Sequence, residues 1–219
     1  MRQAIIQYLE DVRTMLAQMP LESIEQVLQA LLDVYEREGT VFIMGNGGSA
    51  ATASHFAGDL AKGTAHPGLR RFRVVPLTDN VPLITAWAND VDYEWIFAEQ
   101  LRNLVRPGDL VIGISGSGNS PNVLNAIALA REMGATTVGL TGGDGGKLAL
   151  MADIAVIAPS DTMEQIEDAH LVLEHLICTT LRDEIRRREI ASIEALLGGR
   201  PKVPAATPTV LEEPLNGNG

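Results

Sequence analysis

The chain has 219 residues, and 46% of them are apolar, which suits one domain with a real hydrophobic core and excludes wholesale disorder. Its formal net charge of −11 disfavours a nucleic-acid partner, because phosphate backbones repel an acidic surface. No apolar run approaches the ~20 residues that a membrane span needs, and the first residues lack the apolar centre of a signal peptide. The single cysteine, Cys178, excludes an internal disulfide and fits a reducing compartment. We therefore expect a cytoplasmic protein with neither a membrane nor a nucleic acid as partner.

Helical periodicity runs through residues 1–38. Apolar residues such as Ile5 and Leu9 recur at helical spacing, Pro20 interrupts the pattern, and Gly39 ends it. These helices carry more apolar surface than a sheet needs for cover. We therefore expect part of that surface to pack against another subunit.

From residue 39 onward, two kinds of pattern alternate. Short apolar runs are typical of buried strands, and amphipathic stretches are typical of helices. The strand-like runs are Val41–Met44, Phe72–Leu77, Leu110–Ile114, Thr137–Leu140 and Ile154–Ile157. The helix-like stretches lie at 49–62, 80–105, 121–133, 145–151 and 163–188. The alternation predicts βαβ units, and hence an α/β fold with helices on both faces of a five-stranded parallel sheet.

The composition changes after residue 197. Residues 198–219 are rich in Gly, Pro, Ala, Thr and Asn and have no apolar period, so they cannot bury enough surface to fold alone. The sequence therefore predicts N-terminal helices at 1–38, a ligand-binding domain at 39–197 and a flexible tail at 198–219.

Two polar loops follow predicted strands, at the carboxyl ends where parallel sheets bind ligands. The first reads Gly45-Asn-Gly-Gly-Ser-Ala50, and the second reads Ser115-Gly-Ser-Gly-Asn-Ser120, with Pro121 suited to the first position of a helix. Bare amides at a helix start, together with three hydroxyls, suit a phosphate group. Turn residues and a helix cap at Ser120 would explain each serine singly, but three of them at one strand end favour phosphate. Neither loop is a Walker A or dinucleotide motif.

Histidines and carboxylates share helix faces in two places. His55 and Asp59 are four residues apart, about 40° around a helix axis, and such a pair can chelate a divalent metal or exchange protons. Glu167 and His175 differ by about 80° and can reach one cleft. His170 is about 140° from His175, so at most one of these two histidines belongs to a site. Otherwise, such histidines are hydrogen-bonded core residues.

Several strings, in this order, resemble the phosphoheptose isomerases of the sugar isomerase (SIS) domain superfamily. They are Gly45-Asn-Gly-Gly-Ser-Ala50 with His55-Phe-Ala, Ser115-Gly-Ser-Gly-Asn-Ser120, Leu140-Thr-Gly-Gly-Asp-Gly-Gly-Lys147, and Ile166-Glu-Asp-Ala-His170 with His175-Leu. The serine loop is typical of the superfamily, whereas the first string and the last helix are typical of the phosphoheptose branch. The resemblance implies a three-layer α-β-α sandwich with an N-terminal helical extension, and a homotetramer whose sites lie between subunits.

The resemblance also implies an activity and a set of site residues. Such enzymes convert sedoheptulose 7-phosphate to D-glycero-D-manno-heptose 7-phosphate through an enediol. Phosphate would be held by Ser115, Ser117 and Ser120. The sugar would be lined by Asn46, Gly47, Ser49 and Glu167, with Asp90 either a further ligand contact or a helix N-cap. A divalent metal, usually zinc, would be held by His55, Asp59, Glu167 and His175, and we assign Asp59 as the base and His175 as the acid.

Three positions depart from the family pattern: Asp59 replaces Glu, Glu167 replaces Gln, and Gly116 replaces a common Thr. The shorter acid is withdrawn by about 1.5 Å, and misplacement on that scale can cost ~100-fold in rate. The added anion strengthens metal binding or raises the pKa of a neighbouring histidine. The departures leave two alternatives open. One is a non-catalytic phosphosugar-binding or partner-binding SIS protein of the replication-initiator-associating type, and the other is an isomerase for another ketose phosphate.

Overall fold

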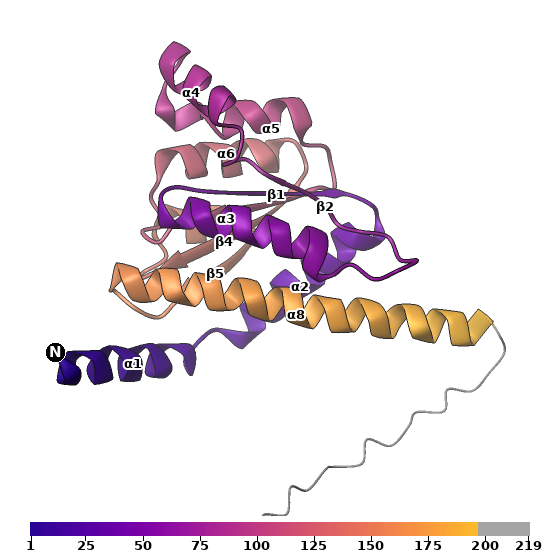
Figure 1. Cartoon of the computed structure of the whole chain (residues 1–219). Coiled ribbons are helices and arrows are strands. Elements are labelled where there is room, and N and C mark those ends of the chain that lie inside the picture. The colour runs from indigo at the N-terminus through magenta and orange to yellow at the C-terminus, as the bar shows by residue number, and fades with distance from the viewer. Residues whose placement is uncertain (197–219) are drawn as a thin grey trace, which may run out of the picture.

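The computed structural model describes residues 1–196, so the tail predicted at 198–219 lies outside the described residues. Within residues 1–196, no helix combines the length and the apolar character needed to cross a membrane. The described chain forms a parallel sheet covered by helices on both faces (Figure 1).

Five parallel strands form the sheet in the order β2-β1-β3-β4-β5. They are β1 (Thr40–Gly45), β2 (Arg73–Pro76), β3 (Leu110–Ile114), β4 (Thr136–Gly142) and β5 (Ile154–Ala158). Each strand coincides with a predicted apolar run, so the predicted sheet is confirmed. The chain passes from β1 outward to β2 and then returns to place β3 on the other side of β1. Gly45 pairs with Ile114 in this register, so the loops that follow β1 and β3 begin side by side.

Helices make up the two outer layers. One layer contains α2 (Leu21–Glu36), α3 (Gly48–Gly58) and α8 (Met163–Leu196), whose buried side chains share one core cluster. The other contains α4 (Val81–Asp90), α5 (Ala98–Leu104), α6 (Pro121–Glu132) and α7 (Gly146–Met151), which pack around a second cluster. The predicted three-layer sandwich is therefore confirmed.

Two predicted helices are interrupted in the structure. The stretch predicted at 80–105 divides into α4, a 3₁₀ turn η2 (Tyr93–Trp95) and α5. The break occurs because Asp92 takes an extended conformation and its Oδ1 accepts from the backbone N–H of Glu94, which starts a new turn. The stretch predicted at 49–62 becomes α3 followed by a π-helical turn η1 (Asp59–Gly63). Such single π-helical turns are frequent at functional sites.

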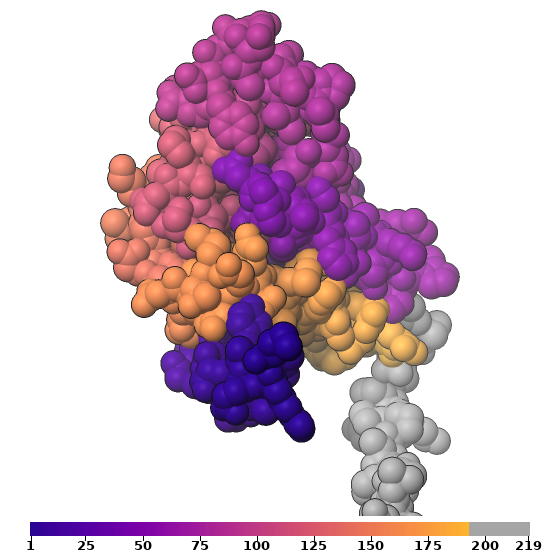
Figure 2. Space-filling view, turned by 60° about the vertical axis from the view of Figure 1, so that its left-hand side comes forward, coloured from indigo at the N-terminus to yellow at the C-terminus, as the bar shows by residue number. Residues whose placement is uncertain are grey.

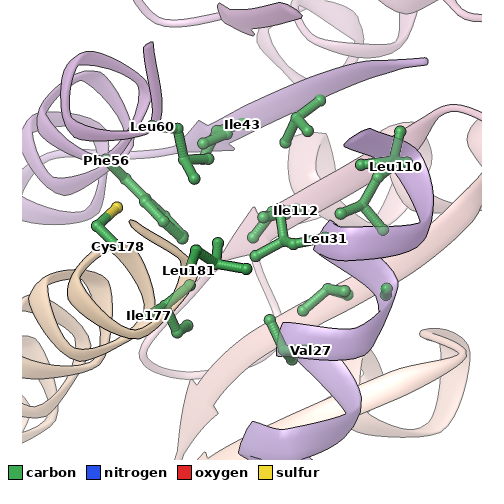
Figure 3. Packing of buried hydrophobic residues seen from close by; sticks show 14 of the residues in the cluster. Val27, Leu31, Ile43, Phe56, Leu60, Leu110, Ile112, Ile177, Cys178 and Leu181 are labelled. Carbon is green, nitrogen blue, oxygen red and sulfur yellow. The ribbon is translucent and has the colours of Figure 1, made fainter. Parts of the chain in front are cut away.

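The core between α2, α3, α8 and the sheet is aliphatic (Figure 3). Leu31, Phe56, Ile112 and Leu181 are fully buried there and meet across the layers. Burying each such side chain stabilises the fold by about 1.5–3 kcal/mol. Cys178 lies in the same cluster as a free thiol whose pKa is raised, mainly by burial. This packing fixes α3 and α8 against each other.

The helix α1 (Arg2–Leu16) is packed differently. Of its side chains only Met15 is buried, whereas Ile5 is 61% and Leu9 is 62% exposed. The Tyr8 hydroxyl donates to Asp168 Oδ2 at 2.7 Å and so ties α1 to α8. In Figure 2, α1 (indigo) lies low in the view, next to α8 (orange). Most of the apolar surface of α1 is thus left uncovered by the rest of residues 1–196.

Candidate active site

The serine loop, Ser115–Ser120, links β3 to α6. Ser115 Oγ and Ser120 Oγ lie 3.0 Å apart. Ser120 is the N-cap residue of α6, yet its side chain makes no capping hydrogen bond within the described chain, so its hydroxyl is not used as a helix cap. Ser117 Oγ accepts from the backbone N–H of Asn119 at 3.2 Å, as a turn residue does, and keeps its own hydrogen to donate. Two hydroxyls and a helix start therefore converge in this loop, as phosphate binding requires.

The glycine-rich turn after β4 supports the serine loop from the side. The N–H of Gly142 donates to Gly116 O at 3.0 Å, and the N–H of Leu148 donates to Gly118 O at 2.9 Å. Gly118 has φ of +63° and packs against the backbone of Gly145 too closely for a Cβ. A hollow of about 310 Å³ opens between this turn, the serine loop and the start of α8. A larger hollow, of about 570 Å³, lies at the amino ends of β1 and β2, away from these groups.

The loop after β1 brings its backbone close to α8. Gly47 has φ of +56° at the N-cap of α3, a conformation that favours glycine. At Gly48 a Cβ would lie 2.5 Å from Glu167 Oε1, so the backbone there lies directly against that carboxylate. Ser49 is buried, and Asn46 contacts Asn122 at the start of α6. Glu167 therefore borders the predicted sugar loop.

Four ionisable side chains meet between α3 and α8. Ligand atoms of His55, Asp59, Glu174 and His175 all lie within 4.8 Å of one another. His55 Nε2 lies 3.9 Å from Asp59 Oδ2, and His55 Nδ1 lies 3.4 Å from Glu174 Oε2. The two imidazole rings meet edge to face, with centroids 5.1 Å apart. We call these four residues the histidine–carboxylate cluster.

Glu174 is the unusual member of the histidine–carboxylate cluster. Its side chain is fully buried, and among residues 1–196 neither carboxylate oxygen has a hydrogen-bond donor. Burial, and then the charge of Asp59, raise the pKa of Glu174 to about 7. A buried carboxylate without a hydrogen-bond donor is costly unless a proton or a cation compensates it. Two imidazoles and two carboxylates form a donor set that suits zinc and related divalent ions.

The cluster contains Glu174 and not the predicted ligand Glu167, whose role as a metal ligand stays a prediction. Glu167 lies against Gly48, while Glu174 lies against His55, seven residues further along both helices. Seven residues span roughly 10 Å of helix, so within this chain Glu167 lies about two turns of α8 away from Glu174 and His55. The two glutamates share a face of α8, which is why spacing from His175 alone did not separate them.

The remaining predicted residues are placed as follows. His55 and Asp59 are brought together as their spacing predicted, and His175 joins them as the resemblance implied. His170 is excluded, because it is buried and its Nε2 faces Thr141 O at 3.2 Å, and burial lowers its pKa. Asp90 is exposed at the end of α4, where it accepts from Asn89 Nδ2, so the N-cap interpretation was wrong. Its contact with substrate stays a prediction.

Comparison with known proteins identifies a family model and several relatives that this chain resembles. A family model described as SIS domain matches residues 7–142. The phosphoheptose isomerase of Trichlorobacter lovleyi is 41% identical over 157 residues, covering 71% of this chain and 79% of that protein. The phosphoheptose isomerase of Aliarcobacter butzleri is 39% identical over 164 residues, covering 75% of this chain and 86% of that protein. The solved phosphoheptose isomerase from Neisseria gonorrhoeae superposes with a TM-score of 0.77 at 30% identity, covering 83% of this chain and 98% of that one.

Proposed function

The chain belongs to the SIS domain family, among the phosphoheptose isomerases, and we propose from this premise that it converts sedoheptulose 7-phosphate to D-glycero-D-manno-heptose 7-phosphate. It is an aldose–ketose isomerase. The observation that carries this proposal is the placement of the histidine–carboxylate cluster between α8 and α3, the helix that starts from the loop beside the serine loop. An anion-binding loop and a set of proton-exchanging groups thus flank the same helix.

The reaction needs one proton moved between two carbons. With the phosphate held by Ser115, Ser117 and Ser120, Asp59 takes a proton from C1 of the ketose, which gives a cis-enediol, and the proton returns at C2. His175, which is exposed, exchanges protons at the sugar oxygens. Asn46, Gly47, Ser49 and Glu167 line the sugar, because their loop and the facing part of α8 adjoin the serine loop.

We further propose that zinc is held by His55, Asp59, Glu174 and His175. The proposal is supported by the buried Glu174, whose oxygens have no hydrogen-bond donor among residues 1–196, and by the nitrogen and oxygen donors within 4.8 Å. When bound, a divalent ion would polarise the substrate carbonyl and stabilise the negative charge that develops on its oxygen. Asp59 has two carboxylate oxygens, so one can face the ion while the other accepts the proton.

We propose a homotetramer located in the cytoplasm. Ile5 and Leu9 of α1, and Val172 and Leu176 beside the catalytic His175, are exposed apolar side chains. A neighbouring subunit packed there would cover them and close the open side of the site. The single cysteine, a buried free thiol, suits a reducing compartment. Light scattering that gives a monomer would count against the shared site.

The activity is tested by incubating the protein with sedoheptulose 7-phosphate and following the sugar by NMR, with and without added zinc. We expect resonances of the aldose heptose 7-phosphate to appear, and His175→Ala to abolish them. Binding of the sugar phosphate without conversion, in either condition, would instead support the non-catalytic alternative. Conversion of a shorter ketose phosphate in preference to the heptulose would support the other alternative.

A further inference from the structure

Asn46 is held by hydrogen bonds from two other segments of the chain. Its Nδ2 donates to Asn122 Oδ1 at 2.8 Å, and Asn122 Nδ2 donates back to Asn46 Oδ1 at 2.9 Å. The Tyr93 hydroxyl donates to the same Asn46 Oδ1 at 3.0 Å. The network therefore joins the loop after β1 to α6 and to η2.

A backbone group fixes the orientation of both amides. The N–H of Val123 donates to Asn122 Oδ1 at 3.0 Å. A backbone N–H can only donate, so this side of the Asn122 amide must be its oxygen. The Asn122 nitrogen must then face Asn46, and Asn46 must turn its oxygen toward it. Asn122 is 1% exposed, so water does not compete for this arrangement.

The network leaves Asn46 with a single free polar function. Both lone pairs of its Oδ1 are taken, by Asn122 and by Tyr93, and one of its two amide hydrogens is taken by Asn122. The half-buried Asn46 can therefore offer a ligand one N–H donor and no acceptor.

We propose that Asn122 and Tyr93 are positioning residues that hold Asn46 as a hydrogen-bond donor toward an oxygen of the bound sugar. The inference rests on the proposed function, since it places a sugar against the loop after β1. It assigns a chemical preference to that position, because a carbonyl or hydroxyl oxygen can accept this hydrogen bond and a protonated amine cannot. It also links sugar and phosphate recognition, because Asn122 follows Ser120 by two residues on the same helix start.

A double-mutant cycle in the full chain tests the inference. Asn46→Ala and Asn122→Ala should each weaken sedoheptulose 7-phosphate binding roughly tenfold in calorimetry, the effect of one lost hydrogen bond. The double variant should bind no more weakly than Asn46→Ala alone, because Asn122 acts through Asn46. Affinity for inorganic phosphate, which reports on the serine loop alone, should stay unchanged in all three.

A second double-mutant cycle combines Tyr93→Phe with Asn46→Ala. Because the Tyr93 side chain is exposed, this cycle remains available if Asn122→Ala does not fold. We expect the affinity for sedoheptulose 7-phosphate to fall about threefold, because Asn46 loses one hydrogen bond while Asn122 still holds its amide. This fall should vanish in the Asn46→Ala background. Matched controls are Asn103→Ala, whose amide nitrogen donates to Glu99 O one turn earlier in its helix, and Tyr35→Phe, whose hydroxyl donates to Arg70 O. Neither control should change sugar binding.

The outcomes separate this inference from the proposed function. Losses that multiply in the double variants, or a parallel loss of phosphate affinity, would overturn the positioning role while leaving the isomerase intact. A wild-type chain that binds phosphate but no sugar phosphate would overturn both.

Discussion

The serine loop and the histidine–carboxylate cluster differ in their chemical groups and in the parts of the sequence that supply them. The loop offers neutral hydroxyls and amides from consecutive residues, and its side chains have hydrogen-bond partners in the loop itself. The cluster gathers ionisable side chains from two helices far apart in the sequence, and its Glu174 has no hydrogen-bond donor in the described chain. The loop is therefore complete without a ligand, whereas the cluster needs a proton or a cation. Changes in the loop should alter affinity, and changes in the cluster should alter turnover, metal content and pH dependence.

The largest effect is expected from removing the base of the cluster. Asp59→Asn keeps the size of the side chain but cannot take a proton, so turnover of sedoheptulose 7-phosphate should fall by about 10²–10⁴-fold. Affinity for inorganic phosphate should be unchanged, because Asp59 lies in the cluster and not in the loop. Asp33→Asn, at an exposed position of α2, is the matched control. Retained turnover would remove Asp59 from the role of base.

The two glutamates of α8 should differ in metal binding. Glu174→Gln should lower zinc affinity by at least about tenfold, since changes even beyond the direct ligands cost that much. Glu167→Gln, seven residues earlier on the same face, should retain its zinc. Equilibrium dialysis followed by elemental analysis measures both variants. The reverse result would restore Glu167 as the ligand.

The sequence predicted the loop better than the cluster for a physical reason. The serines are neighbours in the chain, so the strand before them and Pro121 after them fix their place. His55 and Asp59 share one helix, so helical spacing predicted their contact. Glu174 was missed because its contact with α3 depends on tertiary packing. The signal was a charged residue in the buried stripe of α8 that contains Leu173 and Ile177.

The buried carboxylate should also make stability depend on pH. Because the folded-state pKa of Glu174 is raised from 4.5 to about 7, the folded protein binds more protons than the unfolded chain between about pH 4.5 and 7. Stability of zinc-free protein should therefore fall as pH rises through this window, by up to about 3 kcal/mol. Glu174→Gln should remove this fall and raise Tm by several degrees at pH 8 but little at pH 5. No gain at pH 8 would show that the carboxylate is compensated in the folded protein.

Within the loop, smaller losses of affinity are expected. Ser115→Ala and Ser120→Ala should each weaken inorganic phosphate binding roughly tenfold, because each removes one hydroxyl from the pair 3.0 Å apart. Zinc content should not change in either variant. Ser192→Ala, at an exposed position near the end of α8, is the control. Calorimetric titration with phosphate distinguishes these variants, and unchanged affinity in both would place the phosphate elsewhere.

The smallest effect concerns Gly116, where the loop meets the helix that carries Glu174. A Cβ at Gly116 would lie 2.5 Å from Sδ of Met163, the first residue of α8, so the methionine fills the space that a threonine would need. Met163 is 46% exposed and flexible, so it can move aside. Gly116→Thr should then add a hydroxyl and strengthen phosphate binding by about threefold, and more with Met163→Ala, whereas Gly116→Ala should not. An equal gain in Gly116→Ala would mean that displacement of the methionine, and not the hydroxyl, controls affinity.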